Sequence, residues 1–290
     1  MTVTSHHGRA SDYLELTKPN IVGLILCTVA AGYYLGSPGP LDLAGLIHVV
    51  VGSALVAAGS NALNQILERQ VDAEMRRTRG RPLPSGRLRA AESTVVAWLM
   101  GVAGVVYLAL LTNALVAVLA AVTLGSYVFV YTPLKRYTSF STVVGAVPGA
   151  LPVVGGWAAG RGSVNLEAWV LFGILFLWQL PHFLALAWLY RDDYARAGLR
   201  MLSVTSGAGA TFRQALAYAV ALLPVSLVPT LLGTTGMVYF GGALVLAIWL
   251  IAETLAVMFD HSPLRARRLF LVTVVYLPVM LVLMIIDKAT

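Results

Sequence analysis

An amide and two carboxylates recur at every fourth position near the end of a long apolar run. Asn64, Glu68 and Asp72 follow the spacing i, i+4, i+8, which places their side chains on one face of a helix over roughly 12 Å. All three offer oxygen ligands, and Mg²⁺ binds to one or two carboxylates together with phosphate oxygens of a substrate. The spacing therefore predicts that Asn64, Glu68 and Asp72 are ligands of a metal ion.

Arginines crowd the residues that follow this predicted metal site. Guanidinium groups form paired hydrogen bonds with phosphate, so acids ringed by arginines are typical of a site for a polyanion held through a metal. Proline and glycine at 80–86 predict a sharply turning loop that could lie over the site as a lid. The alternative is a solvated helix end whose arginines only fix topology. The arginines concerned are Arg69, Arg76, Arg77, Arg79 and Arg81.

A second polar group lies in the stretch WQLPHFLALAWLYRDDYARAGLRM, residues 178–201. His182 and Asp193 are 11 residues apart, so a continuous helix would bring them to one face. Asp193 is then expected at the same membrane face as the first acids, as a fourth metal ligand. His182 would lie roughly 12–16 Å deeper along that helix. An ionisable group at that depth is a functional candidate, and contact with a ligand, proton transfer and interhelical packing remain its alternatives.

The helices that must position these residues are expected to span a membrane. The chain has 290 residues, 58% hydrophobic and 11% charged, whereas soluble domains contain about 25% charged residues. About 20 apolar residues cross the hydrocarbon, and nine runs qualify, so we predict an all-α polytopic protein with a central cavity open to the cytoplasm. The first run is short and is expected to include residues on either side of Pro19. The runs are 19–36, 43–67, 91–112, 114–131, 141–159, 167–189, 213–232, 236–258 and 268–286.

The basic residues predict the orientation of this bundle. Eighteen of the 20 lysines and arginines fall before the first run or in alternate gaps, and only Arg161 and Lys288 fall on the other side. The positive-inside rule then places the N-terminus in the cytoplasm and the C-terminus outside. This topological distribution argues against nucleic acid as the partner of a chain with a net charge of +7.

The whole chain, residues 1–290, is expected to form one membrane domain. Two long cytoplasmic gaps, at 68–90 and 190–212, lie four spans apart. That arrangement suggests a duplicated four-helix unit, with spans one to four repeated as spans five to eight and a ninth helix appended. The single cysteine excludes an intrachain disulfide.

The first polar stretch resembles a signature of the intramembrane prenyltransferase superfamily, N-x-x-x-D-x-x-x-D followed by R-T-x-x-R-P-L. Asn64, Glu68 and Asp72 occupy its three positions, with Glu68 in place of the usual aspartate. The segment YTPLKR at 131–136 resembles the superfamily's Y-x-x-x-K element. The resemblance implies that Mg²⁺ is the cofactor and that the bound headgroup is a diphosphate.

The second stretch resembles one branch, the protohaem IX farnesyltransferase family, through W-Q-x-P-H-F and D-Y-x-x-A-G-x-x-M. The segment LTKPN at 16–20 resembles that family's L-T-K-P-R, with Asn20 departing from it. The resemblance implies transfer of a farnesyl group from farnesyl diphosphate to haem B in a bacterial or archaeal cell membrane. It makes His182 a candidate haem contact, axial ligand or base, and leaves open whether a haem A synthase docks. The expected diphosphate-binding residues are Lys18, Arg77, Arg81, Lys135 and Arg136. For Lys135 and Arg136, an equal alternative is that they only fix the orientation of the helices in the membrane.

Other functions remain alternatives at this stage. A prenyltransferase for aromatic quinone precursors is the nearest, although the chain lacks a second D-x-x-x-D motif. A transporter would bind its substrate near the bilayer midplane, whereas these acids crowd one face beside arginines. A haem-binding electron carrier would need paired axial histidines, and only His182 lies at a suitable depth.

Overall fold

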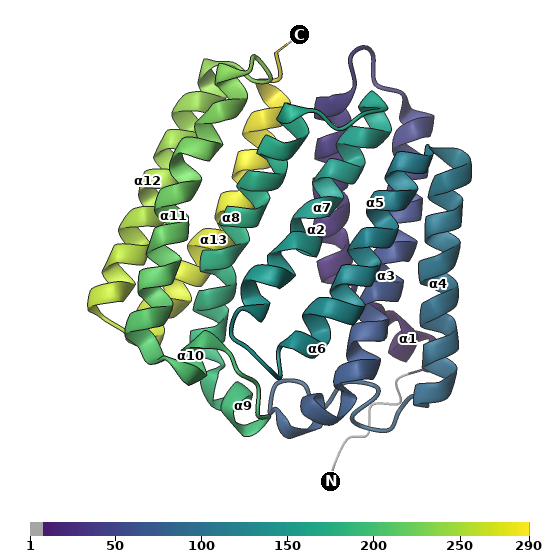
Figure 1. The fold of residues 1–290 in the computed structure, drawn as a ribbon, viewed down its shortest axis with the longest axis vertical. Coiled ribbons are helices and arrows are strands. Elements are labelled where there is room, and N and C mark those ends of the chain that lie inside the picture. The colour runs from purple at the N-terminus through teal and green to yellow at the C-terminus, as the bar shows by residue number, and fades with distance from the viewer. Residues whose placement is uncertain (1–7, 290) are drawn as a thin grey trace.

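The computed structural model describes residues 8–289, which form one helical bundle without strands in that range (Figure 1). Nine segments of this range are long and apolar enough to cross a membrane. The fourth of them consists of α5, a π-helical segment η1 and the short α6. Their bounds are α2 Pro19–Gly36, α3 Leu43–Glu74, α4 Ala90–Leu111, α5 Ala114–Gly125, η1 Ser126–Tyr131, α6 Thr132–Leu134, α7 Ser141–Arg161, α8 Leu166–Leu189, α11 Gly207–Leu231, α12 Met237–Phe259 and α13 Pro263–Ile286.

The nine predicted spans are confirmed, but two helix boundaries were predicted wrongly. The first span does not extend upstream of Pro19, because Lys18 adopts a left-handed conformation (φ 57°) and separates α1 (Arg9–Thr17) from α2. Proline is favoured at the first position of a helix, where no N–H is needed. Likewise, no continuous helix joins His182 to Asp193: α8 ends at Leu189 and α9 (Arg191–Arg196) starts anew.

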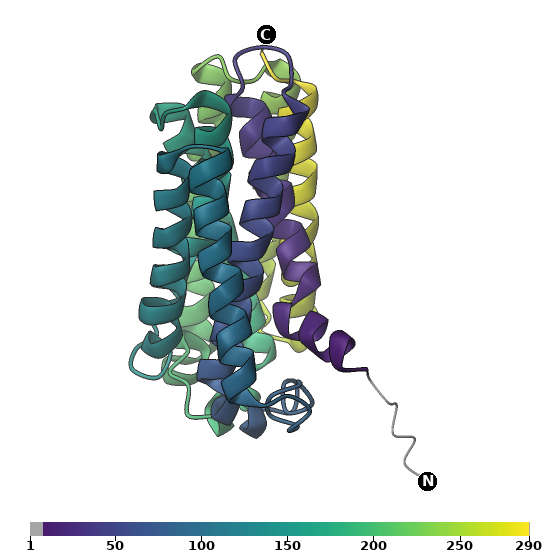
Figure 2. The same cartoon turned by 90° about the vertical axis from the view of Figure 1, so that its right-hand side faces the viewer.

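One end of the bundle carries the short helices and the longest connection. Helices α1, α9 and α10 (Leu202–Thr205) and the segment 75–89 lie where α3 and α8 end, whereas α13 ends at the opposite side (Figures 1 and 2). Arg87 ties segment 75–89 to α1 through ion pairs with Asp12 and Glu15. Leu16 of α1 packs in one apolar cluster with Leu83 of that segment. The segment is thus packed over the end of α3.

Helices α2 and α7 approach each other closely where glycines of the two helices meet. A Cβ atom on Gly32 would lie 2.2 Å from the carbonyl oxygen of Val153, and one on Gly156 would lie 2.0 Å from that of Val29. Small residues allow such close approach in membranes, where apolar surface alone does not drive helices together. These contacts fix the distance between α2 and α7.

The chain beyond α13 returns to the first span. The ammonium of Lys288 donates to the carbonyl oxygens of Tyr34 (2.7 Å) and Ser37 (2.8 Å) at the end of α2. Asp287 accepts a hydrogen bond from the backbone of Tyr239 at the start of α12 (2.7 Å). Carbonyls at a helix end lack partners within the helix, so Lys288 caps α2 and joins the first span to the last.

We expect Gly156→Ala to destabilise the protein and Gly155→Ala to leave it unchanged or slightly more stable. Overpacking costs about 1–3 kcal/mol, whereas a Cβ at Gly155 meets nothing within 4 Å. Thermal unfolding of both variants in one detergent measures the difference. Equal melting temperatures for the two variants would contradict a tight α2–α7 contact.

Orientation in the membrane stays a prediction that labelling can test. In a Cys27→Ser background, Ser85→Cys lies exposed in segment 75–89 and Ser163→Cys lies exposed in the connection between α7 and α8. A maleimide that cannot cross the membrane is added to cells in which it can reach the outer face of the membrane that contains the protein. It should label position 163. Position 85 should react only after the membrane is opened, and the reverse pattern would overturn the predicted topology.

Candidate active site

The last turns of α3 carry the amide and both carboxylates on one buried face. Asn64 and Asp72 are almost fully buried, and Glu68 nearly so. The Asn64 amide donates to Glu68 Oε2 at 3.0 Å, as the spacing of one helical turn requires. The sequence therefore predicted correctly which α3 residues share this face, and their role as metal ligands stays a prediction.

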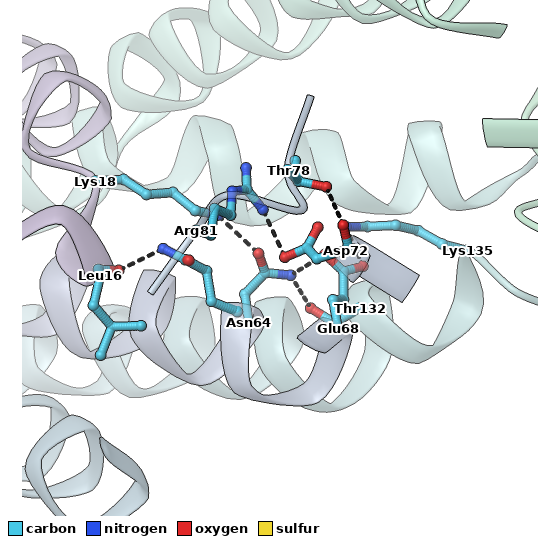
Figure 3. A network of polar contacts seen from close by, with 10 residues as sticks. Leu16, Lys18, Asn64, Glu68, Asp72, Thr78, Arg81, Thr132 and Lys135 are labelled. Carbon is cyan, nitrogen blue, oxygen red and sulfur yellow. Dashed lines mark hydrogen bonds and ion pairs between the residues drawn. The ribbon is translucent and has the colours of Figure 1, made fainter. Parts of the chain in front are cut away.

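Three cations from three different segments contact these groups (Figure 3). Lys18, between α1 and α2, donates to Asn64 Oδ1 at 2.9 Å. Lys135, just after α6, forms an ion pair with Glu68 at 2.6 Å. Arg81, from segment 75–89, forms one with Asp72 at 2.8 Å. The structure thus brings together three of the five predicted diphosphate-binding residues, although they are far apart in sequence.

The electrostatics of the cluster favour an added anion. Burial, followed by repulsion from Arg81, lowers the pKa of Lys18 from 10.5 to about 7. Burial also opposes the charge on Lys135, but the neighbouring Tyr131 and Glu68 outweigh it and raise the pKa of that lysine above its ordinary value. Lys18 is therefore held only partly charged at neutral pH, and an arriving anion would favour its protonation.

The π-helical turn η1 and the first residue of α6 supply two further residues that the sequence analysis did not assign. Single π turns are frequent at functional sites. At the end of η1, the Tyr131 ring lies 4.5 Å from Lys135 Nζ, and the Thr132 hydroxyl accepts from the Asn64 amide at 3.1 Å. Tyr131 stands in the Y-x-x-x-K element and was identifiable from it. Thr132 had no such signal, because its contact depends on how α3 and α6 pack.

Asp193 lies at the same end of the bundle as the α3 cluster. Its carboxylate accepts from the backbone N–H of Arg77 at 3.3 Å and pairs with Arg196. The Arg77 guanidinium is 4.9 Å from the centre of the Tyr190 ring. Residues of α9 and its flanks pack on the end of α3 in one cluster that includes Val71 and Met75. The separate helix α9 thus brings Asp193 next to the predicted site.

Besides Arg77 and Asp193, two predicted residues lie outside the α3 cluster. Arg136 is exposed, and its side chain makes no hydrogen bond or ion pair within residues 8–289, which favours the topological interpretation. His182 instead lines an apolar cavity of about 370 Å³ formed by α2, α3, α4, α5, η1, α7, α8 and α13. Asn61 and Tyr131 line the same cavity, so it adjoins the α3 cluster.

Comparison with known proteins identifies the family. The model of the UbiA prenyltransferase family matches residues 25–280. The chain belongs to this family. It is 47% identical over 287 residues to "Protoheme IX farnesyltransferase" of Solibacter usitatus, covering 96% of this chain and 98% of that one. The predicted resemblance to a prenyltransferase is therefore confirmed.

Two solved structures support the fold of the family. One, from work on digeranylgeranylglyceryl phosphate synthase in membranes, covers 96% of this chain and 98% of its own with a TM-score of 0.81 at 18% identity. The other is a UbiA homologue from Archaeoglobus fulgidus bound to DMAPP and Mg²⁺, with 94% and 99% coverage, a TM-score of 0.65 and 17% identity. At these identities the likeness establishes the all-helical membrane fold.

The oxygen donors of this family member suit Mg²⁺ bound together with a phosphate ligand. Within residues 8–289, no three His, Cys, Asp or Glu side chains stand close enough to form a metal cage by themselves. Asn64, Glu68 and Asp72 provide hard oxygen donors, and their cationic partners are side chains that can also bind phosphate. The arrangement therefore fits a metal ion that takes some of its ligands from the protein and the others from a diphosphate.

We expect Lys135→Met to lower the stability by about 3 kcal/mol, because it leaves Glu68 charged and mostly buried. Both side chains of this pair are 12% exposed. The double variant Lys135→Met/Glu68→Gln should recover most of the loss, as a double-mutant cycle would show. The matched control is Arg9→Met, whose pair with Glu92 is largely exposed and is worth about 0–1 kcal/mol. Equal costs for both single variants would contradict a buried pair.

Proposed function

We propose that the protein transfers the farnesyl group of farnesyl diphosphate to a vinyl group of haem B, with addition of water, giving haem O and diphosphate. The observation that carries this proposal is the 47% identity over nearly the whole length to a protoheme IX farnesyltransferase. The buried cluster of oxygen donors and cations beside an apolar cavity supports the same conclusion from geometry.

The diphosphate would bind at the end of α3. Lys18, Arg81 and Lys135 neutralise its charge, and Arg77 reaches it from segment 75–89. Asn64, Glu68 and Asp72, together with Asp193, would hold Mg²⁺, and a bound Mg²⁺ would supply Lewis-acid stabilisation of the leaving group. Cations placed beforehand around a departing anion cost no reorganisation during the reaction.

The chemistry begins with the bond between the farnesyl C1 atom and the diphosphate oxygen. Its electron pair leaves with the diphosphate, and the allylic cation that remains is attacked by the vinyl π-electrons of haem. A new carbon–carbon bond forms, and the positive charge moves to the carbon beside the macrocycle. Water adds there and loses a proton, which leaves a hydroxyethylfarnesyl group.

The apolar cavity suits the farnesyl chain. Its walls are mainly aliphatic and aromatic, with Leu24, Val56 and Leu175 among them, so an isoprenoid chain gains the usual transfer energy of about 25 cal/mol per Å² buried. The same walls keep water from the first cation. Tyr131, which touches both the cavity and Lys135, marks where the chain would pass into the headgroup site.

The setting of the reaction is proposed to be a bacterial or archaeal cell membrane, with the α3 cluster on the cytoplasmic side. Both substrates are poorly soluble in water, farnesyl diphosphate because of its tail and haem because of its macrocycle. A haem A synthase that takes over the product is a candidate partner.

We expect Asp72→Asn to lower turnover at least about 100-fold while the protein still folds in membranes. Removing one group that stabilises developing charge typically costs that much. Asp193→Asn should also lower turnover. Purified protein is incubated with haem B, farnesyl diphosphate and Mg²⁺, and the product is measured by mass spectrometry as haem that has gained a farnesyl group and water. A chelator should abolish the product and added Mg²⁺ should restore it.

Matched controls lie beside both residues. Glu74→Gln changes an exposed acid on the same helix as Asp72, and Asp192→Asn changes the exposed neighbour of Asp193, so both should retain turnover. Wild-type turnover in Asp72→Asn would remove the metal assignment. Transfer to an aromatic quinone precursor and not to haem B would replace the proposed acceptor.

A further inference from the structure

His182 is held by aromatic rings inside the apolar cavity. The Trp178 ring stacks against it with centroids 5.6 Å apart at 26°, and Phe270 of α13 lies 4.8 Å away at 32°. Phe183 meets its edge at 5.7 Å. Packing from three sides fixes the plane of the imidazole, so its two nitrogens point in defined directions.

One of these nitrogens is bound to α13. His182 Nδ1 lies 2.8 Å from the hydroxyl of Thr273. That hydroxyl has a single proton, which it donates to the carbonyl oxygen of Phe270 at 2.6 Å. The hydroxyl therefore accepts from His182, so Nδ1 carries a proton.

Thr273 is itself held firmly. Its side chain is fully buried, and its carbonyl oxygen accepts from the indole N–H of Trp178 at 2.8 Å. Trp178, His182 and Thr273 thus form one connected unit between α8 and α13. This unit fixes both the tautomer and the orientation of the histidine.

The other nitrogen faces the cavity with a free lone pair. In the part of the chain that the structure describes, Nε2 has no hydrogen-bond partner. It is not fully buried either, because it keeps some exposed surface. It is therefore accessible, and His182 lines the cavity. A neutral imidazole with Nδ1–H bonded to protein and Nε2 open is the form in which histidine binds a metal.

The surroundings of His182 favour ligation over proton transfer. A base would become an imidazolium, and no acid within residues 8–289 contacts His182 by hydrogen bond or ion pair. Its contacts are three aromatic rings and one hydroxyl, and none of them carries a negative charge that could pair with a buried imidazolium. Binding to iron keeps the imidazole neutral, which suits this environment.

The position of His182 in the bundle also fits the reaction. His182 and Tyr131 line the same cavity, and the Tyr131 ring lies 4.5 Å from Lys135 Nζ. The cavity therefore connects His182 with the α3 cluster. An iron bound to His182 would hold the macrocycle in the cavity that adjoins this cluster.

We propose that His182 binds the iron of the haem substrate through Nε2, and that Thr273 is the positioning residue that holds its tautomer. This inference rests on the proposed function, because it assigns the site of the acceptor. The axial bond fixes the macrocycle while its vinyl edge reacts at the periphery.

The test uses the full chain in lipid nanodiscs, titrated with haem B and followed by Soret and ferrous–CO spectra. Wild type should show a histidine-ligated spectrum. His182→Ala should lose that spectrum and at least about tenfold in haem affinity, and added imidazole should restore the spectrum. Thr273→Val should weaken haem binding about 10–100-fold, as loss of a partner behind a metal-bound histidine does, whereas Thr273→Ser should bind like wild type.

Two controls separate coordination from packing. Iron-free protoporphyrin IX offers no metal, so wild type and His182→Ala should bind it equally, which also shows that the variant folds. His48→Ala removes a histidine that instead bonds to Tyr107 and should leave the haem spectrum unchanged.

The outcomes distinguish this inference from the proposed function. If wild type makes haem O while His182→Ala keeps the wild-type spectrum and affinity, the ligation is wrong and the proposed function stands. If His182→Ala binds haem normally but loses turnover, His182 acts in the reaction and not as a ligand. If wild type binds haem through His182 but forms no farnesylated product, the proposed function fails. If wild type does not bind haem, both fail.

Discussion

Charged side chains remain buried at the end of this bundle because cations and anions neutralise one another there. Glu68 and Asp72 each contact a cation that comes from another segment, Lys135 and Arg81 respectively. The attraction within each pair offsets the free-energy cost of removing both charges from water, which an unpaired charge would not recover. The connections that bring in the cations, segment 75–89 and the turn at Lys18, are therefore part of the site.

The same balance supports the proposed binding of a polyanion. In that proposal, a diphosphate would offer the cations a partner of higher charge, and the carboxylates that they release would be free to hold Mg²⁺. The exchange of partners would take place among the side chains of one cluster. Without a ligand, the ion pairs of the cluster balance its charges.

The sequence predicted much of this fold for a physical reason. Long apolar runs and the asymmetry of the basic residues follow directly from the bilayer, and the α3 face follows from helical periodicity. Contacts between helices do not follow from either. Thr132 and Thr273 are ordinary threonines in the sequence, and only packing places them beside Asn64 and His182. The break at Tyr190 was also missed, and with it the reason that Asp193 reaches α3 from a separate helix. The duplicated four-helix unit stays a prediction.

Helix α13 has a consequence for how such a protein is made. It supplies Thr273 to the histidine, and the Lys288 that follows it caps the first span. During synthesis the earlier spans therefore enter the bilayer with α2 uncapped and the cavity lacking one wall. Until the ninth span has been inserted, the nascent chain lacks both the wall that carries Thr273 and the cap on α2, so the proposed haem site would be complete only after the last helix has been made.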